Sequence, residues 1–263
     1  MIFKQLFEAD SSTYTYLIGC EETGESVLID PVIETVERDL GVVRELGLKP
    51  TYTLETHIHA DHLTGAKKMR ALSGSKIVVP EMDQLACADL GVKEGEVFVV
   101  GNIKLHPLHT PGHTSTHHAY MIDTGVHKML FSGDALLIEA CGRTDFQSGD
   151  ARTLYKSISQ KFFTLPDETL VYPGHDYEGR QITTIRQEKQ RNPRLKEGID
   201  EENFVKIMES LDLPYPRKID FAVPGNTACG ECPDNVPEEY RGPCDILEVA
   251  PNTTLTSKQG DQG

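Results

Sequence analysis

The stretch THIHADHLTG, residues 56–65, places three histidines and an aspartate within a few positions: His57, His59, Asp61 and His62. The whole chain contains only 10 histidines among its 263 residues. Alternate residues of an extended segment point to the same side, so His57, His59 and Asp61 can face one cavity. Burying such polar groups together is costly unless a cation compensates them. The segment therefore predicts a metal site.

Three further motifs contain a possible ligand directly after a glycine. The ligands are His113 in TPGHT, Asp134 in SGDAL and His175 in PGHDY. Glycine lets the backbone turn sharply and present the next side chain. Imidazole and carboxylate donors of this kind suit zinc, iron or manganese. We interpret the other histidines as ordinary hydrogen-bonded residues, namely His106, His109, His117, His118 and His127.

Each of these motifs follows a predicted strand, and loops at strand ends are where rigid scaffolds carry their sites. After an N-terminal strand, apolar patterns and turn residues predict strands over 13–18, 26–30, 51–55, 76–80, 117–123, 127–134 and 169–176, and a hairpin over 96–109. Periodic segments predict helices over 34–46, 64–74, 150–163, 178–190 and 200–211. Interleaved strands and helices with several hairpins predict a layered α/β protein with mixed sheets.

The composition excludes several classes of function. The formal net charge is -15, which repels phosphate backbones and anionic lipid, so we expect no nucleic-acid and no membrane partner. No run of 18 apolar residues suggests a membrane span. The N-terminal residues resemble neither a signal peptide nor a presequence, and we expect a bacterial, cytoplasmic protein.

The cysteines and the C-terminal region carry weaker signals. Six cysteines are too sparse to predict a disulfide scaffold. Cys229 and Cys232 form a CGEC motif, typical of a redox pair or half a zinc site, but only Cys244 follows it and we disfavour both roles. We expect a catalytic domain over 1–223 and a Pro/Gly-rich extension over 224–263, whose last part is a polar tail.

Four motifs in order, THIHADH, TPGHT, SGDAL and PGHDY, resemble the metallo-β-lactamase superfamily. That resemblance implies an αββα sandwich with a metal site at the edges of its sheets. Residues 141–158 (CGRTDFQSGDARTLYKSI) and 213–226 (LPYPRKIDFAVPGN) further resemble the persulfide dioxygenase family, the sulfur dioxygenases related to the protein lost in ethylmalonic encephalopathy.

The resemblance implies a single ferrous iron on His57, His113 and Asp134. The number of candidate ligands alone points instead to a site for two metals, with His57, His59 and His113 on one metal, Asp61, His62 and His175 on the second, and Asp134 between them. In the mononuclear interpretation His59, Asp61, His62 and His175 orient the ligands and bound water, and Asp61, His62 and His175 are the candidate catalytic residues.

The implied reaction oxidises glutathione persulfide with O2 and gives sulfite and glutathione. The alternative is a hydrolase of S-acyl glutathione thioesters that resembles glyoxalase II and carries two zinc ions. The family also implies a homodimer, and a sulfurtransferase that delivers the persulfide is a candidate partner.

Glutathione carries two carboxylates, so we expect cationic side chains near the metal. The candidates for substrate binding are Arg143, Arg217 and Lys218, because arginine binds a carboxylate with two parallel hydrogen bonds. Tyr177 is a candidate donor to the peptide. A structural ion pair between Arg143 and Asp145 is the competing interpretation.

Overall fold

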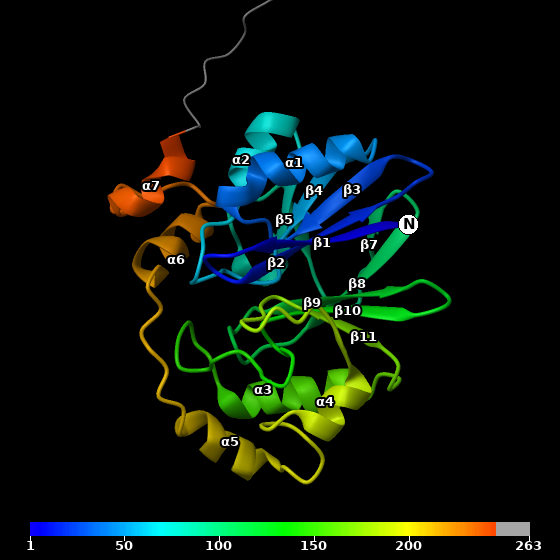
Figure 1. The fold of residues 1–263 in the computed structure, drawn as a ribbon, viewed down its shortest axis with the longest axis vertical. Helices are drawn as coiled ribbons and strands as arrows, with labels where there is room; N and C mark the ends of the chain where they lie inside the picture. The colour runs from blue at the N-terminus through cyan, green and yellow to red at the C-terminus, as the bar shows by residue number, and fades with distance from the viewer. Residues whose placement is uncertain (246–263) are drawn as a thin grey trace, which may run out of the picture.

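Two six-stranded sheets form the middle of the computed structural model, which describes residues 1–245 (Figure 1). The first sheet has the order β1-β2-β3-β4-β5-β6 and the second has the order β12-β11-β10-β9-β8-β7. The first consists of β1 (Ile2–Glu8), β2 (Thr13–Gly19), β3 (Glu25–Ile29), β4 (Lys49–Leu54), β5 (Lys76–Pro80) and β6 (Leu90–Val92). The second consists of β7 (Phe98–Val100), β8 (Ile103–His109), β9 (His118–Asp123), β10 (Lys128–Gly133), β11 (Leu170–Pro173) and β12 (Thr183–Thr184). Both sheets mix parallel with antiparallel pairs, as the sequence predicts.

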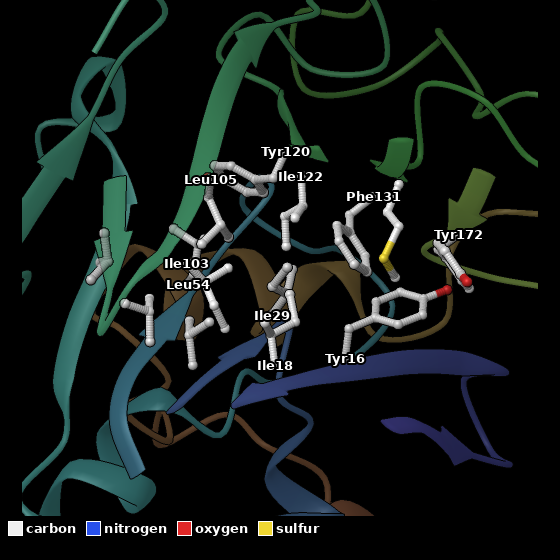
Figure 2. Packing of buried hydrophobic residues seen from close by; sticks show 14 of the residues in the cluster. Tyr16, Ile18, Ile29, Leu54, Ile103, Leu105, Tyr120, Ile122, Phe131 and Tyr172 are labelled. Atoms are coloured by element: carbon white, nitrogen blue, oxygen red, sulfur yellow. The ribbon is translucent and has the colours of Figure 1, made fainter. Parts of the chain in front are cut away.

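The space between the sheets is filled by apolar side chains from both (Figure 2). Strand alternation selects them: Tyr16 and Ile18 of β2 face this core, and Leu17 between them faces the outer helices. Phe131 of β10 packs against Tyr16 with ring centroids 5.1 Å apart, which ties one sheet to the other. Burial on both faces explains why β2 has no exposed side chain.

Helices cover the outer face of each sheet (Figure 1). Helices α1 (Val36–Glu45) and α2 (Ala66–Ser73) pack on the first sheet. Helices α3 (Ala151–Ser157), α4 (Ile185–Arg191) and α5 (Glu201–Glu209) cover the second, and a π-helical turn, Ile158–Phe162, extends α3. Short 3-10 turns occur at Ile33–Thr35 and Glu81–Asp83. The layers run helix, sheet, sheet, helix and confirm the αββα sandwich.

The predicted helix over 178–190 is wrong in its first half. Residues 178–182 are irregular, because the buried carboxylate of Asp176 accepts the backbone N–H groups of Glu178 and Arg180 at 3.0 and 2.6 Å. The helix begins only at Ile185, where the Thr184 hydroxyl accepts the N–H of Gln187 at 3.2 Å.

Two helices lie in the region for which the sequence predicts none. Helix α6 (Ile219–Thr227) contains Pro224, and α7 (Glu238–Asp245) contains Pro243. Helix α6 runs through the boundary that the sequence places between residues 223 and 224, and that boundary stays a prediction. No helix within residues 1–245 is long and apolar enough to cross a membrane.

Two disulfides crosslink the C-terminal region, contrary to the prediction from cysteine number. Cys229 pairs with Cys87, and Cys232 pairs with Cys244. The two cysteines of CGEC therefore do not pair with each other and do not form half of a zinc site. Spacing does not reveal the first crosslink, because its cysteines are 142 residues apart.

Candidate metal centre

Four loops that follow strand ends meet at one edge of the sandwich. The loop after β4 carries THIHADH, the loop after β8 carries His113, and the ends of β10 and β11 carry Asp134 and His175. Strands β10 and β11 are parallel neighbours, so their carboxyl ends emerge side by side. A hydrogen bond of 2.8 Å from Tyr14 N to Gly174 O joins the first sheet to this edge.

The seven side chains that the sequence proposes as ligands form a closed ring. The centroid of the His57 ring lies 4.1 Å from that of His59, which lies 4.4 Å from His62. Next in the ring, His62 Nδ1 lies 2.8 Å from Asp61 Oδ2, which lies 3.6 Å from His175 Nε2. The same His175 nitrogen lies 3.5 Å from Asp134 Oδ1, and the other Asp134 oxygen, Oδ2, lies 3.6 Å from His113 Nε2. It closes between His113 and His57, whose centroids are 4.9 Å apart.

Hydrogen bonds orient His57 and His113 as ligands. The Thr56 hydroxyl donates to Asp30 Oδ2 at 2.8 Å and lies 2.9 Å from His57 Nδ1, so it accepts the Nδ1 proton. His113 Nδ1 donates in the same way to Arg143 O at 2.7 Å. Both bonds leave the Nε2 lone pair free for a cation, as in known metal sites. Burial, together with the nearby imidazoles of His59 and His113, lowers the pKa of His57 well below its usual value, which keeps that ring neutral.

Asp134 is held by a histidine that the sequence does not single out. The backbone N–H of Asp134 donates to His117 Nε2 at 3.1 Å, and His117 Nδ1 pairs with Thr110 Oγ1 at 2.8 Å. Burial lowers the pKa of His117 well below its usual value, in keeping with a neutral ring. No pattern in the sequence distinguishes His117 from an ordinary core histidine, so residue types alone do not predict its role.

His59 contacts two buried carboxylates. Its Nε2 lies 3.2 Å from Asp30 Oδ1 and 3.4 Å from Glu55 Oε2. Burial lowers the pKa of His59, but the two carboxylates outweigh it and raise the pKa well above its usual value. A proton on Nε2 fixes the orientation of the ring. Asp30 and Glu55 are thus two residues of the site that sequence reasoning missed.

Asp61, His62 and His175 form the other half of the ring. His175 donates from Nδ1 to Ser11 O at 3.2 Å and turns its Nε2 toward Asp61 and Asp134. Burial raises the pKa of Asp61, but His62 and His175 outweigh it and hold the pKa well below its usual value. An anionic carboxylate and imidazoles therefore face one another here.

The donor set fits a transition-metal ion. His57, His113 and Asp134 offer ligand atoms within 4.8 Å of one another, and so do His59, Asp61 and His62. Asp134 Oδ1 is buried without a hydrogen-bond partner in the described part of the chain. Buried polar atoms usually have a partner, and a bound cation would provide one for this oxygen. Two imidazoles and one carboxylate match the set that binds non-haem iron.

A cavity of about 530 Å³ opens above the ring. Asp61, His113, Asp134 and His175 line its floor. Its walls carry several cationic and aromatic side chains, namely Arg143, Arg180, Arg194, Arg217, Tyr177 and Tyr215. The size lies in the range of sites that enclose a small organic ligand.

Arg143 reaches this cavity and also makes the structural ion pair that was the competing interpretation. Its Nε and Nη2 donate to the two carboxylate oxygens of Asp145, both at 2.7 Å, and Nη1 donates to Pro214 O at 2.9 Å. The guanidinium also lies 4.6 Å above the ring of Phe146. Arg143 thus fixes the cavity wall around Pro214.

The other predicted substrate-binding residues divide into two kinds. Tyr177 and Arg217 line the cavity, and the Tyr177 ring is parallel to that of His175. The prediction for Lys218 is wrong, because its side chain is buried outside the cavity. Its Nζ lies 2.6 Å from Asp10 Oδ2 and 3.6 Å from Glu34 Oε1, so its charge is already neutralised.

Arg194 and Cys141 complete the wall. Arg194 lies in a segment without a recognisable motif, and its Nη1 donates to Cys141 O at 2.9 Å. Cys141 is a buried free thiol whose pKa burial raises to about 11, so it stays protonated at neutral pH. This environment is that of a structural cysteine rather than a reactive one.

Comparison with known protein families shows the superfamily to which the chain belongs. The family model of the metallo-beta-lactamase superfamily matches residues 9–175, which include all seven side chains of the ring. Together with the αββα layers and the four site loops, this match defines a metallo-β-lactamase fold protein.

Comparison with individual relatives shows to which family within the superfamily the chain belongs. The chain is 47% identical to the human mitochondrial persulfide dioxygenase ETHE1 over 231 residues, which are 88% of this chain and 89% of the relative. The crystal structure of ETHE1 from Myxococcus xanthus is 50% identical, covers 88% of this chain and 100% of its own, and superposes with a TM-score of 0.83. A hydroxyacylglutathione hydrolase from Polaromonas is 38% identical over 67% of each chain. The chain belongs to the persulfide dioxygenase family.

Proposed function

We propose that this enzyme oxidises glutathione persulfide with O2 to sulfite and glutathione at one ferrous iron. The observation that carries the proposal is 47% identity to persulfide dioxygenases along 89% of their length. The hydrolase relative is less similar and is matched over a smaller share of its chain.

His57, His113 and Asp134 would hold the iron. When bound, ferrous iron supplies the redox chemistry with O2 that amino-acid side chains lack. The protein contributes the orientation of its ligands: Thr56 fixes His57, the Arg143 carbonyl fixes His113, and the His117 ring fixes the backbone of Asp134.

Asp61, His62 and His175 serve proton transfer. One persulfide, one O2 and one water give one glutathione thiol and one sulfurous acid, which releases its protons near neutral pH. His175 Nε2 borders the cavity, where it can accept those protons. Asp61 Oδ2 lies 3.6 Å from His175 Nε2 and stays anionic, so it stabilises the protonated imidazole. His62 Nδ1, at 2.8 Å from Asp61 Oδ2, keeps that carboxylate in place.

The cavity arginines bind the carboxylates of the glutathione moiety. Arg143 pairs with Asp145 and Arg180 with Glu139, whereas Arg194 and Arg217 make no ion pair with a protein carboxylate within residues 1–245 and are available to a substrate. Arg143 retains N–H groups beyond those bound to Asp145 and Pro214, because a guanidinium carries five donors. Tyr177 offers a hydroxyl on the same wall.

Oxygen consumption with glutathione persulfide, measured on protein of known metal content, tests the proposal. We expect about one iron per chain, one O2 consumed per sulfite formed, and no hydrolysis of an S-acyl glutathione. Two zinc ions per chain and rapid thioester hydrolysis without O2 uptake would establish the hydrolase instead.

Asp61→Ala tests how many metal ions the ring holds. In the mononuclear enzyme this variant keeps about one iron and loses activity by roughly 10–100-fold, as when a hydrogen-bonding neighbour of a ligand is removed. Elemental analysis measures the outcome, and a fall from two metals to one would support the dinuclear site. Asp145→Ala is the control, because that exposed carboxylate pairs with Arg143 outside the ring.

Assembly and location remain proposals from the sequence. They are a homodimer, a sulfurtransferase that delivers the persulfide, and a bacterial cytoplasm. Size-exclusion chromatography with light scattering measures the first of these directly.

A further inference from the structure

The C-terminal region reaches back to the metal-binding loop at the end of α6. This helix lies beside the first sheet (Figure 1), and its buried residue Asn226 faces the loop that carries His59, Asp61 and His62. Residue 226 belongs to the part of the chain that the sequence assigns to an extension outside the catalytic domain.

One side-chain amide satisfies three backbone groups of that loop. Asn226 Nδ2 donates to His59 O at 2.9 Å and to His62 O at 2.8 Å. Its Oδ1 accepts the backbone N–H of Thr64 at 2.8 Å. The loop is irregular between β4 and α2, so these groups are not part of a sheet or helix.

Neighbouring contacts fix the position of Asn226. The carbonyl of Cys229 accepts the N–H of Lys67 at 3.1 Å in the first turn of α2, and Cys229 is crosslinked to Cys87. A Cβ on Gly230 would lie 2.1 Å from Thr64 O, so the two backbones touch. Phe221 and Leu63 share an apolar cluster on the other side.

We propose that Asn226 is a positioning residue of the metal centre, which fixes the loop so that its side chains face the ion. The inference rests on the proposed metal site but not on which metal it holds or which reaction follows. An asparagine suits the task because one amide group offers two donors and an acceptor. Aspartate has nearly the same shape but would present its second oxygen to the carbonyls of His59 and His62.

Cobalt(II) titration of the metal-free protein, followed by its visible absorption, tests the role. We expect Asn226→Ala and Asn226→Asp each to weaken cobalt binding by roughly 10–100-fold and to change the absorption bands at saturation, because the ligands on the loop are displaced. Asn226→Asp retains the acceptor for Thr64 and serves as the second variant if Asn226→Ala does not fold.

Asn192→Ala is the matched control. Asn192 is also fully buried and also makes three hydrogen bonds, to Ala140 O, Glu188 Oε2 and the N–H of Arg194. It should lower the thermal midpoint of unfolding but keep the cobalt affinity within about twofold and the bands unchanged.

The outcomes separate the inference from the proposed function. A wild-type protein that binds no cobalt at the ring would defeat the proposed metal centre itself. If the wild type binds cobalt and a folded Asn226 variant binds it equally tightly with the same spectrum, Asn226 is a purely structural residue and the inference is wrong.

Discussion

Asp134 is the residue on which the metal assignment depends most. Its two carboxylate oxygens face different histidines, Oδ2 toward His113 and Oδ1 toward His175, so it touches both halves of the ring. We expect Asp134→Ala to lose nearly all bound iron and all oxygen uptake, since it removes the one carboxylate of the proposed triad. Iron analysis and circular dichroism measure this, and a folded variant with full iron content would refute the triad.

Arg143 combines a structural contact with a proposed substrate contact. Arg143→Ala should raise the KM for glutathione persulfide by roughly 10-fold or more, the usual loss for a hydrogen bond to a charged group, with iron content unchanged. Arg143→Lys should recover part of the loss, because an ammonium lacks the planar fork.

Asp145→Ala is the control for Arg143, because it breaks the same ion pair and spares the guanidinium. We expect a lower thermal midpoint with little change in KM. Equal KM effects in both variants would mean that Arg143 acts by holding the wall at Pro214 rather than by binding substrate.

Residue types and spacing predicted all seven side chains of the ring, because histidines and carboxylates are rarely buried together without a cation that compensates them. They did not predict Asp30 and His117, which support the ring from other segments, or Glu55, which directly precedes the THIHADH motif. Nor could they show that Lys218 is neutralised by Asp10. Such partners are decided by the three-dimensional fold.

At the scale of elements, the start of α3 fixes the loop that carries His113. The backbone N–H of Asp150 donates to Gly112 O at 2.8 Å, and a Cβ on Gly112 would lie 2.3 Å from the backbone of Leu154. Gly112 also has φ of +132°, which other residues rarely adopt. Gly112→Ala should therefore push the loop away from α3, lower the free energy of unfolding by about 1–3 kcal/mol or more, and weaken iron binding.

Gly47→Ala is the control for that prediction. Gly47 also has positive φ, at +68°, but a Cβ there would meet no atom within 4 Å and the residue lies far from the ring. Gly47→Ala should lower the free energy of unfolding and leave iron binding unchanged. Urea unfolding and iron analysis of both variants separate the two effects, and unchanged iron binding in Gly112→Ala would contradict the role of α3.

Strong periodic patterns predicted most strands and helices, whereas helices that tertiary contacts stabilise were missed. Helix α6 contains Pro224 and Gly225, both poor helix formers. It forms because Phe221 and Ala222 bury against Leu63 and Ile33, a gain that no local pattern reveals. The late start of α4 has the same kind of origin, since it depends on the buried carboxylate of Asp176.

Over the whole molecule, the negative net charge contrasts with the arginines that line the cavity. The chain carries a formal charge of -15, yet four arginines line the cavity above the ring, namely Arg143, Arg180, Arg194 and Arg217. Arg143 and Arg180 are paired with protein carboxylates, so Arg194 and Arg217, which make no ion pair within residues 1–245, are the cations of this wall that can attract an anionic ligand. This arrangement agrees with a glutathione derivative as substrate.

The crosslinks join the C-terminal region to the rest of the molecule, and they lead to a prediction about its chemistry. Titration of the unfolded, unreduced protein should detect two thiols, Cys20 and Cys141, and titration after reduction should detect all six cysteines. Cys20→Ser is the control and should lower the first count to one. Six thiols without reduction would contradict both crosslinks. That result would favour the reducing cytoplasm that we expect from the sequence, because disulfides persist mainly in oxidising compartments.

The two crosslinks should also differ in how much they stabilise the fold. Cys87–Cys229 spans 142 residues and Cys232–Cys244 spans 12. The loss of chain entropy in the unfolded state predicts about 5 kcal/mol for the longer loop and about 3 kcal/mol for the shorter one. Urea unfolding of Cys87→Ser and Cys232→Ser without reductant measures the difference. Because Cys229 also holds the segment that carries Asn226, Cys87→Ser should weaken metal binding as well, whereas Cys232→Ser, whose crosslink lies beyond that segment, should leave it unchanged.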